Sequence, residues 1–88
     1  MTNILLIGAT SAISQSTSRL FAKDGATLFL IARDEARLKV ISSDLLERGA
    51  KTVKTAVLDV REFECQEEVI NRAFDELGTV DVMLIAHG

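Results

Sequence analysis

Small and hydroxyl-bearing residues follow the first apolar run of this sequence, and together they could bind a phosphate group. Residues 4–7 form a continuous apolar run typical of a buried parallel strand, and Gly8 follows it directly. A glycine there lets the backbone turn sharply and approach a ligand closely. Thr10 and Ser11 come next and leave the N–H groups of the following helix open to an anion, which the helix dipole also favours. We therefore predict a strand that positions a nucleotide-binding loop.

A cation stands where the second helix is expected to begin. Arg33 follows the second apolar run and directly precedes Asp34, a residue suited to capping a helix. The helix dipole disfavours a positive charge at this end by roughly a few tenths of a kcal/mol. A bound anion would offset that cost. The alternatives are a solvated arginine or an ion pair with a nearby acid such as Glu35.

Two further polar residues occupy positions where ligands gather, and each has a structural explanation as well. Asp59 precedes the third helical segment, where an N-cap contributes about 1 kcal/mol and is compatible with a ligand contact. His87 follows the fourth apolar run, at the strand end where ligands of open α/β sheets bind. No carboxylate or nucleophile accompanies it, so we expect it to line a site or be exposed rather than to catalyse. Cys65 has no activating sequence context, and no metal-ligand spacing occurs.

Composition excludes several classes of function. The 88 residues carry a net charge of −3 with scattered lysines and arginines, so no basic surface for nucleic acid or an anionic membrane is expected. No apolar run approaches the roughly 20 residues that span a bilayer. A single cysteine and an N-terminus without a basic signal-peptide region favour the cytoplasm.

Strand-like runs alternate with helical patterns along the whole chain. We predict strands at residues 4–7, 27–31, 52–58 and 80–86. Glycines are expected to end the three intervening helices at Gly25, Gly49 and Gly78. The apolar faces of these helices are predicted to carry Ile13, Thr17, Leu20 and Phe21; Leu38, Ile41 and Leu45; and Phe63, Ile70, Ala73, Phe74 and Leu77. Such βαβ repetition predicts a single α/β domain, residues 1–88, around a parallel sheet.

Four landmarks in order make the chain resemble the N-terminal half of a short-chain dehydrogenase/reductase. The glycine-rich TGxxxGxG turn of that family matches residues 7–14, and the end of its second strand matches residues 32–34. Its Asp-Val pair matches residues 59–60, and its NNAG segment matches residues 85–88. The resemblance implies a Rossmann-like three-layer sandwich with strand order 3-2-1-4 and an NAD(P) cofactor.

The resemblance also assigns cofactor contacts. Ala32 stands where an acid would bind the 2′-hydroxyl of NAD, and Arg33 follows it, which favours the 2′-phosphate of NADP. Two glycines of the turn are replaced, by Ala12 and Ser14, which weakens the expected contact with the pyrophosphate. The residues expected to contact the cofactor are Gly8, Thr10, Ser11, Ile13, Arg33, Asp59, Val60, Ala86, His87 and Gly88.

The family's catalytic Ser and Tyr-x-x-x-Lys residues have no counterpart here, because they fall beyond residue 88 and the sequence contains no tyrosine. We therefore expect a truncated oxidoreductase that is inactive alone, with a non-catalytic nucleotide-binding or oligomerising module as the alternative. The fourth strand, which a fifth strand covers in the family, would be a bare apolar edge. Self-association through that edge or through an uncovered sheet face is predicted.

Overall fold

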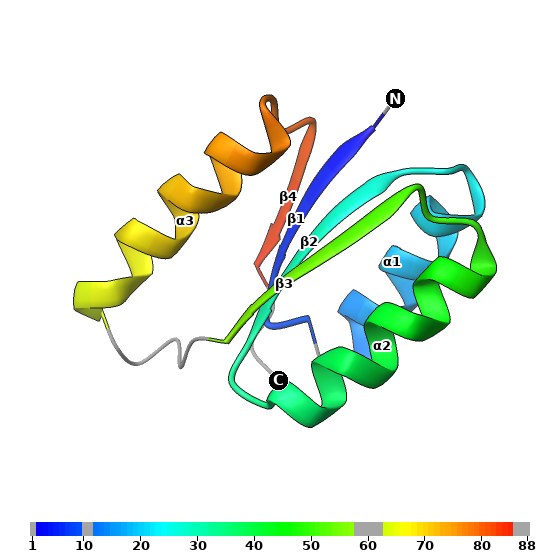
Figure 1. Ribbon diagram of the computed structural model, residues 1–88, viewed down its shortest axis with the longest axis horizontal. Coiled ribbons are helices and arrows are strands. Elements are labelled where there is room, and N and C mark those ends of the chain that lie inside the picture. Colours follow the sequence, from blue (N-terminus) through cyan, green and yellow to red (C-terminus); the bar gives the residue numbers. More distant parts are fainter. Residues whose placement is uncertain (1, 10–11, 58–62, 86–88) are drawn as a thin grey trace.

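The computed structural model describes residues 2–9, 12–57 and 63–85, apart from the side chains of residues 63–67 and 69. Strands and helices alternate along the chain, as predicted (Figure 1). The elements are β1 (Asn3–Ile7), α1 (Ala12–Lys23), β2 (Thr27–Ala32), α2 (Glu35–Arg48), β3 (Thr52–Val57), α3 (Phe63–Leu77) and β4 (Val82–Ile85).

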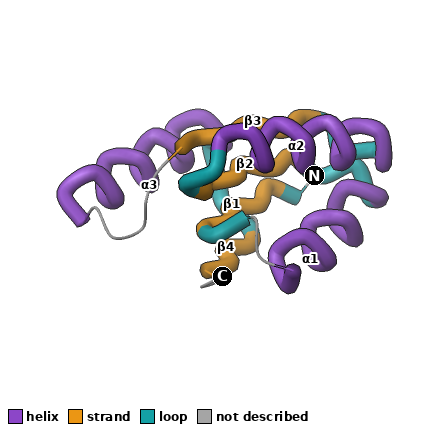
Figure 2. The backbone as a smooth tube through the Cα atoms, turned by 90° about the horizontal axis from the view of Figure 1, so that it is seen from below, coloured by secondary structure: helices purple, strands orange, loops and turns teal. Residues whose placement is uncertain are grey.

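The four strands form one parallel sheet with the order β3-β2-β1-β4, which confirms the predicted order. Ile7 at the carboxyl end of β1 pairs with Ile31 of β2 and with Ile85 of β4. The carboxyl ends of these three strands therefore lie together at one edge of the sheet. Helices α1 and α2 cover one face and α3 covers the other, so the fold is the expected three-layer Rossmann-like sandwich (Figures 1 and 2).

The two inner strands are buried from both sides because helices pack on each face. In β2, Leu28 and Leu30 belong to the cluster under α1 and α2, whereas Phe29 and Ile31 belong to the cluster under α3. All four side chains are fully buried. A continuous apolar run in the sequence thus marks a strand between two helical layers.

Helix α1 packs on the sheet through a face that the prediction identified only in part. Its buried residues are Ser14, Ser18 and Ala22, whereas Ile13 and Leu20 are 70% and 71% exposed. The small buried residues recur every fourth position and allow the helix backbone to approach the strands closely. Of the predicted residues Phe21 does pack against the core, but hydrophobicity misplaced Ile13 and Leu20, because close packing selected side-chain size.

Helix α2 matches its prediction at both ends and along its inner face. The Asp34 carboxylate accepts a hydrogen bond from the Arg37 amide (3.1 Å), as an N-cap does. Leu38, Ile41 and Leu45 are buried as expected. Gly49 ends the helix with a φ of 121°, and a Cβ there would lie 3.1 Å from the Ala22 carbonyl oxygen of α1. This glycine lets the ends of the two helices meet.

The third and fourth units follow the prediction in part. In α3, Ala73 and Leu77 are buried, but Phe74 is exposed because it lies beside the sheet-facing side of the helix. Strand β4 begins at Val82, two residues later than predicted. The Asp81 amide before it donates to the Asn3 carbonyl oxygen, and the Asp81 carboxylate accepts a bond from the Asn3 amide. The predicted cap at Asp59 lies outside the described residues.

Candidate functional site

The turn after β1 has the backbone conformation that a glycine permits. Gly8 has a φ of 81°, in the left-handed region that other residues rarely adopt. Its amide and the Ala9 amide both donate to the Ile31 carbonyl oxygen, at 2.8 and 3.1 Å. These two amides hold the turn against β2 and are not available to a ligand. Gly8 therefore contributes shape to the predicted loop, and amide donors would have to come from residues further along it.

The start of α1 lies directly beyond this turn. Ala12 and Ile13 are exposed, so neither side chain is buried in the place where a bound phosphate is expected. Ser14, at the position of the third family glycine, is fully buried. The third glycine of such turns allows close packing of helix and strand, and the small serine side chain is compatible with that role. The first amides of the helix have no acceptor within it, which suits an anion.

Arg33 lies beyond the end of β2 with its side chain exposed, next to the buried Ala32. Two acids follow it, but both are engaged elsewhere. The Asp34 carboxylate caps α2 through the Arg37 amide, and the Glu35 carboxylate pairs with the Lys39 ammonium at 3.5 Å. The proposed alternative, an ion pair between Arg33 and Glu35, is therefore not formed. A solvated arginine and an anion-binding arginine are the remaining interpretations.

The parallel sheet places Gly8 and Arg33 at the same edge, because each follows one of the paired residues Ile7 and Ile31 closely. Ile13 extends from the helix that begins there. The other predicted cofactor contacts lie outside the described residues and stay predictions: Thr10, Ser11, Asp59, Val60, Ala86, His87 and Gly88.

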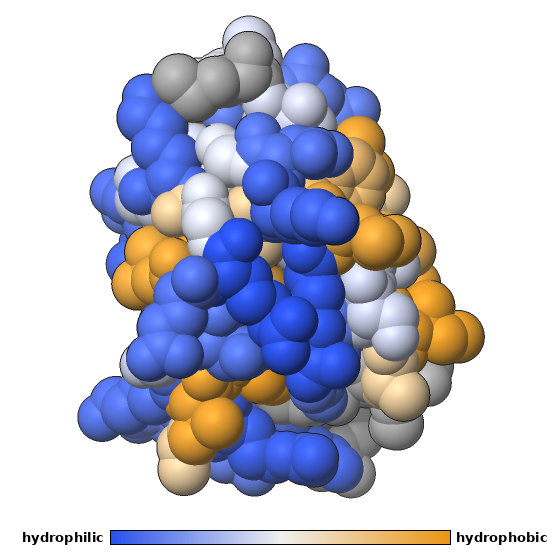
Figure 3. All heavy atoms as spheres, turned by 90° about the vertical axis from the view of Figure 1, so that its right-hand side faces the viewer, coloured by the Kyte–Doolittle hydropathy of each residue, from blue (hydrophilic) through white to orange (hydrophobic). Residues whose placement is uncertain are grey.

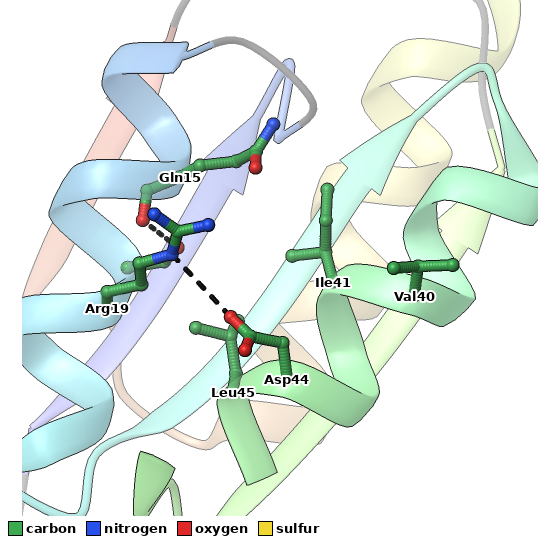
Figure 4. Close-up of a pocket in the computed structure, with 7 residues that line it drawn as sticks. Gln15, Arg19, Val40, Ile41, Asp44 and Leu45 are labelled. Atoms are coloured by element: carbon green, nitrogen blue, oxygen red, sulfur yellow. Dashed lines mark hydrogen bonds and ion pairs between the residues drawn. The ribbon is translucent and has the colours of Figure 1, made fainter. Parts of the chain in front are cut away.

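A groove between α1 and α2 was not anticipated from the sequence. It has a volume of about 230 Å³, and Figure 4 shows the residues that line it, Gln15, Ser18, Arg19, Val40, Ile41, Asp44 and Leu45. The Asp44 carboxylate lies 3.5 Å from Arg19 and 2.8 Å from Arg48. The i,i+4 spacing of Asp44 and Arg48 was the available signal. Because Oδ2 of Asp44 contacts an arginine of each helix, this carboxylate links α1 and α2 across the groove.

Neither a cluster of metal ligands nor a membrane-spanning helix is found among the described residues. Within residues 2–9, 12–57 and 63–85, no three His, Cys, Asp or Glu residues come together to hold a metal ion. None of the helices described there is long and apolar enough to cross a bilayer. Hydrophilic residues cover most of the outer side of the α1 and α2 layer, with hydrophobic residues in separate patches (Figure 3).

Comparison with known proteins decides the family. The model of the short chain dehydrogenase family matches residues 2–88. The chain belongs to the short-chain dehydrogenase family. Among curated relatives of this short-chain dehydrogenase chain is a hydroxysteroid 11-beta-dehydrogenase 1-like protein of Xenopus tropicalis, 35% identical over 98% of the chain. The matched region makes up 30% of that relative.

Solved structures of the family agree in fold. An alcohol dehydrogenase from the archaeon Thermococcus sibiricus, in complex with 5-hydroxy-NADP, matches 94% of the chain with a TM-score of 0.84 and 33% identity. An actinorhodin polyketide ketoreductase with NADPH matches 99% with a TM-score of 0.83 and 30% identity. The chain covers 35% and 33% of those two proteins. It therefore spans about a third of the length of the relatives it matches.

Proposed function

We propose that this chain is the N-terminal, NADP(H)-binding portion of a short-chain oxidoreductase. The observation that carries the proposal is the exposed Arg33 beyond β2, whose acidic neighbours Asp34 and Glu35 are both engaged by other groups. The buried Ala32 occupies the position where an acid would bind the 2′-hydroxyl of NAD, so no carboxylate at that position repels a 2′-phosphate. Two similar proteins of known structure were solved with NADPH or an NADP derivative, which supports the same cofactor here.

The residues present fit such a cofactor. Gly8 provides the sharp turn, and the exposed Ile13 leaves the start of α1 uncovered by its own side chain. We assign the pyrophosphate to the loop residues Thr10 and Ser11 and the 2′-phosphate to Arg33. We assign the adenine contact to Asp59 and Val60. Ala86, His87 and Gly88, which follow β4, are assigned to the rest of the cofactor site. When bound, the nicotinamide would supply hydride transfer.

The 88 residues are proposed to bind the cofactor without turning over a substrate. The family's catalytic tyrosine has no candidate because the sequence contains no tyrosine. His87 is proposed to line the cofactor site rather than to act as a catalytic base. Any substrate would therefore be bound by residues other than these 88. Its single cysteine favours a reducing compartment such as the cytoplasm.

Titration calorimetry with NADP and with NAD tests the proposal directly. We expect NADP to bind at least tenfold more tightly than NAD, a difference of about 1.4 kcal/mol. Arg33→Ala should reduce this preference about tenfold and leave NAD binding unchanged. Lys23→Ala, which removes an exposed cation from the far end of α1, is the matched control. Heat of binding with neither dinucleotide, or turnover by the chain alone, would contradict the proposal.

A second proposed role, self-association, is supported by the free edge of β4. Met83 and Ile85 of this strand are 46% and 54% exposed, and none of its four residues is charged. An apolar edge strand is a template for pairing with another chain. We expect a homodimer or larger assembly by light scattering at micromolar concentrations. A monomer under those conditions would exclude this role.

A further inference from the structure

Two exposed arginines lie at the start of α2, one just before the helix and one in its first turn, four residues apart. Arg33 precedes the cap Asp34, and Arg37 is the third residue of the helix. Neither takes part in an ion pair or a side-chain hydrogen bond with any other described residue. By contrast, Arg19, Arg48 and Arg72 each pair with a carboxylate.

The position of Arg37 is electrostatically unfavourable in the absence of an anion. It lies in the first turn, where the helix dipole disfavours a cation. Because a long side chain in a helix leans back over the preceding turn, we expect the Arg37 guanidinium to extend toward the end of α2 that Arg33 adjoins. Two like charges thus share one end of a helix in a protein whose net charge is −3.

The acids of this turn do not neutralise the two arginines. The Asp34 carboxylate binds the Arg37 backbone amide at 3.1 Å, so its position is fixed by the cap. The Glu35 carboxylate pairs with Lys39 one turn further along the helix. With Glu35 and Lys39 balancing each other, Arg33 and Arg37 outnumber the Asp34 carboxylate, so the end of α2 keeps an excess of one positive charge.

We propose that Arg37 is a second specificity-determining residue, which binds the 2′-phosphate of the cofactor together with Arg33. This inference rests on the proposed function and adds a residue to it. A phosphate monoester carries close to two negative charges and three acceptor oxygens, which suits two guanidinium groups. Arg33 would approach it from the end of β2 and Arg37 from the first turn of α2. The cost of placing Arg37 near the positive end of the dipole is offset when the anion is bound.

The test uses calorimetric titration of the whole chain with NADP and NAD, and with the fragments adenosine 2′,5′-bisphosphate and ADP. Arg37→Ala should weaken NADP and the 2′,5′-bisphosphate about tenfold and leave NAD and ADP unchanged. Arg33→Ala should do the same, and the double variant should bind NADP no better than NAD. Lys39→Ala is the matched control, because it removes a cation from the same helix that is paired with Glu35.

The salt dependence of NADP affinity and the thermal melt of Arg37→Ala distinguish a phosphate contact from a structural role of this residue. Loss of Arg37 should lower the dependence of NADP affinity on salt concentration, since one contact with the phosphate is removed. The cap survives in Arg37→Ala because the backbone amide remains, so the thermal melt should change little. If Arg33→Ala abolishes the NADP preference while Arg37→Ala preserves it, the inference is wrong and the proposed function stands. If the unmodified chain binds neither dinucleotide, both are overturned.

Discussion

The two edge strands of the sheet are built differently. In β3, the Lys54 ammonium lies 3.6 Å from the Glu76 carboxylate of α3, and its polar neighbour Thr55 is exposed. In β4, no residue is charged, and Met83 and Ile85 are exposed. Charged residues on an edge discourage pairing with another strand, whereas an uncharged apolar edge invites it. The sheet is thus closed at β3 and open at β4.

The helices repeat this asymmetry. Helix α2 packs directly on β3, and α3 reaches that side through the Lys54–Glu76 pair. Around α1, Gln15 and Arg19 face α2, so Ile13 and Leu20 lie on the flank turned away from α2. That flank is the one toward β4. Exposed apolar residues therefore lie on both sides of the sheet near β4. Ile13 and Leu20 are in the α1 layer, whereas Met83 and Ile85 are on the opposite face, next to Leu5 and Ile7 of the cluster under α3. Val57 at the end of β3 is also exposed.

The largest difference between the two sides should appear in stability. Leu45→Ala removes a fully buried side chain under α2 and should cost about 2–5 kcal/mol of unfolding free energy. Ile85→Ala, a truncation of a half-exposed side chain at the open edge, should cost about 1 kcal/mol or less. Urea unfolding at low protein concentration measures both. Equal losses would show that the β4 edge is as tightly packed as the closed side.

Self-association should depend on the open edge alone. Met83→Lys places a charge on β4 and should weaken any dimer by more than tenfold, about 1.4 kcal/mol, because pairing would bury the ammonium. Thr55→Lys places the same charge on β3, where the residue is already exposed, and should leave association unchanged. Sedimentation velocity over a concentration series measures the effect. A dimer lost in Thr55→Lys but kept in Met83→Lys would reverse the comparison.

Removing the N-cap of α2 tests whether the stability of the β3 side of the sheet depends on that helix. Asp34→Ala removes the acceptor of the Arg37 amide and should cost about 1 kcal/mol of unfolding free energy. Asp34→Asn keeps an acceptor and should retain most of that stability. Thermal melts followed by circular dichroism distinguish the two variants. Equal melting temperatures for Asp34→Ala and the parent chain would mean that the cap contributes nothing.

The smallest effect on stability is expected at the Lys54–Glu76 pair. Both side chains are partly exposed, so Lys54→Val should change the unfolding free energy by only about 0.2–1 kcal/mol. The same substitution removes the charge that guards β3, and it should create new concentration-dependent association. Sedimentation of Lys54→Val beside Lys54→Gln, which keeps the edge polar, is the measurement. Association in neither variant would show that Lys54 does not protect this edge.

The sequence predicted most of the fold because local signals agreed with the packing. The cap Asp34 and the inner residues of α2 follow from spacing and side-chain type, and they are confirmed. Helix α1 did not follow, because Ser14 and Ser18 are buried for their small size, a criterion that hydrophobicity does not contain. Tight packing between a helix and a strand therefore has to be inferred from volume.

The candidate site was less predictable for a related reason. Arg33 was expected from its place after β2, but its freedom from Glu35 depends on the competing Glu35–Lys39 pair, which only the helical geometry reveals. The engagement of the Ala9 amide by Ile31 likewise depends on how the turn lies against β2. The sequence pattern predicts which residues could form a contact. Which partner each one takes depends on the other groups that lie close to it in the folded structure.

The bonds between Asn3 and Asp81 join residues 78 positions apart. Strand β1 is synthesised well before β4, so its side toward β4 stays unpaired until residues 82–85 have left the ribosome. Contacts between such distant positions slow folding, because a long loop must close before they form. A nascent chain would thus present β1 with only its β2 side paired until β4 is made, and chaperones that bind extended apolar segments would have access to the other side before β4 does.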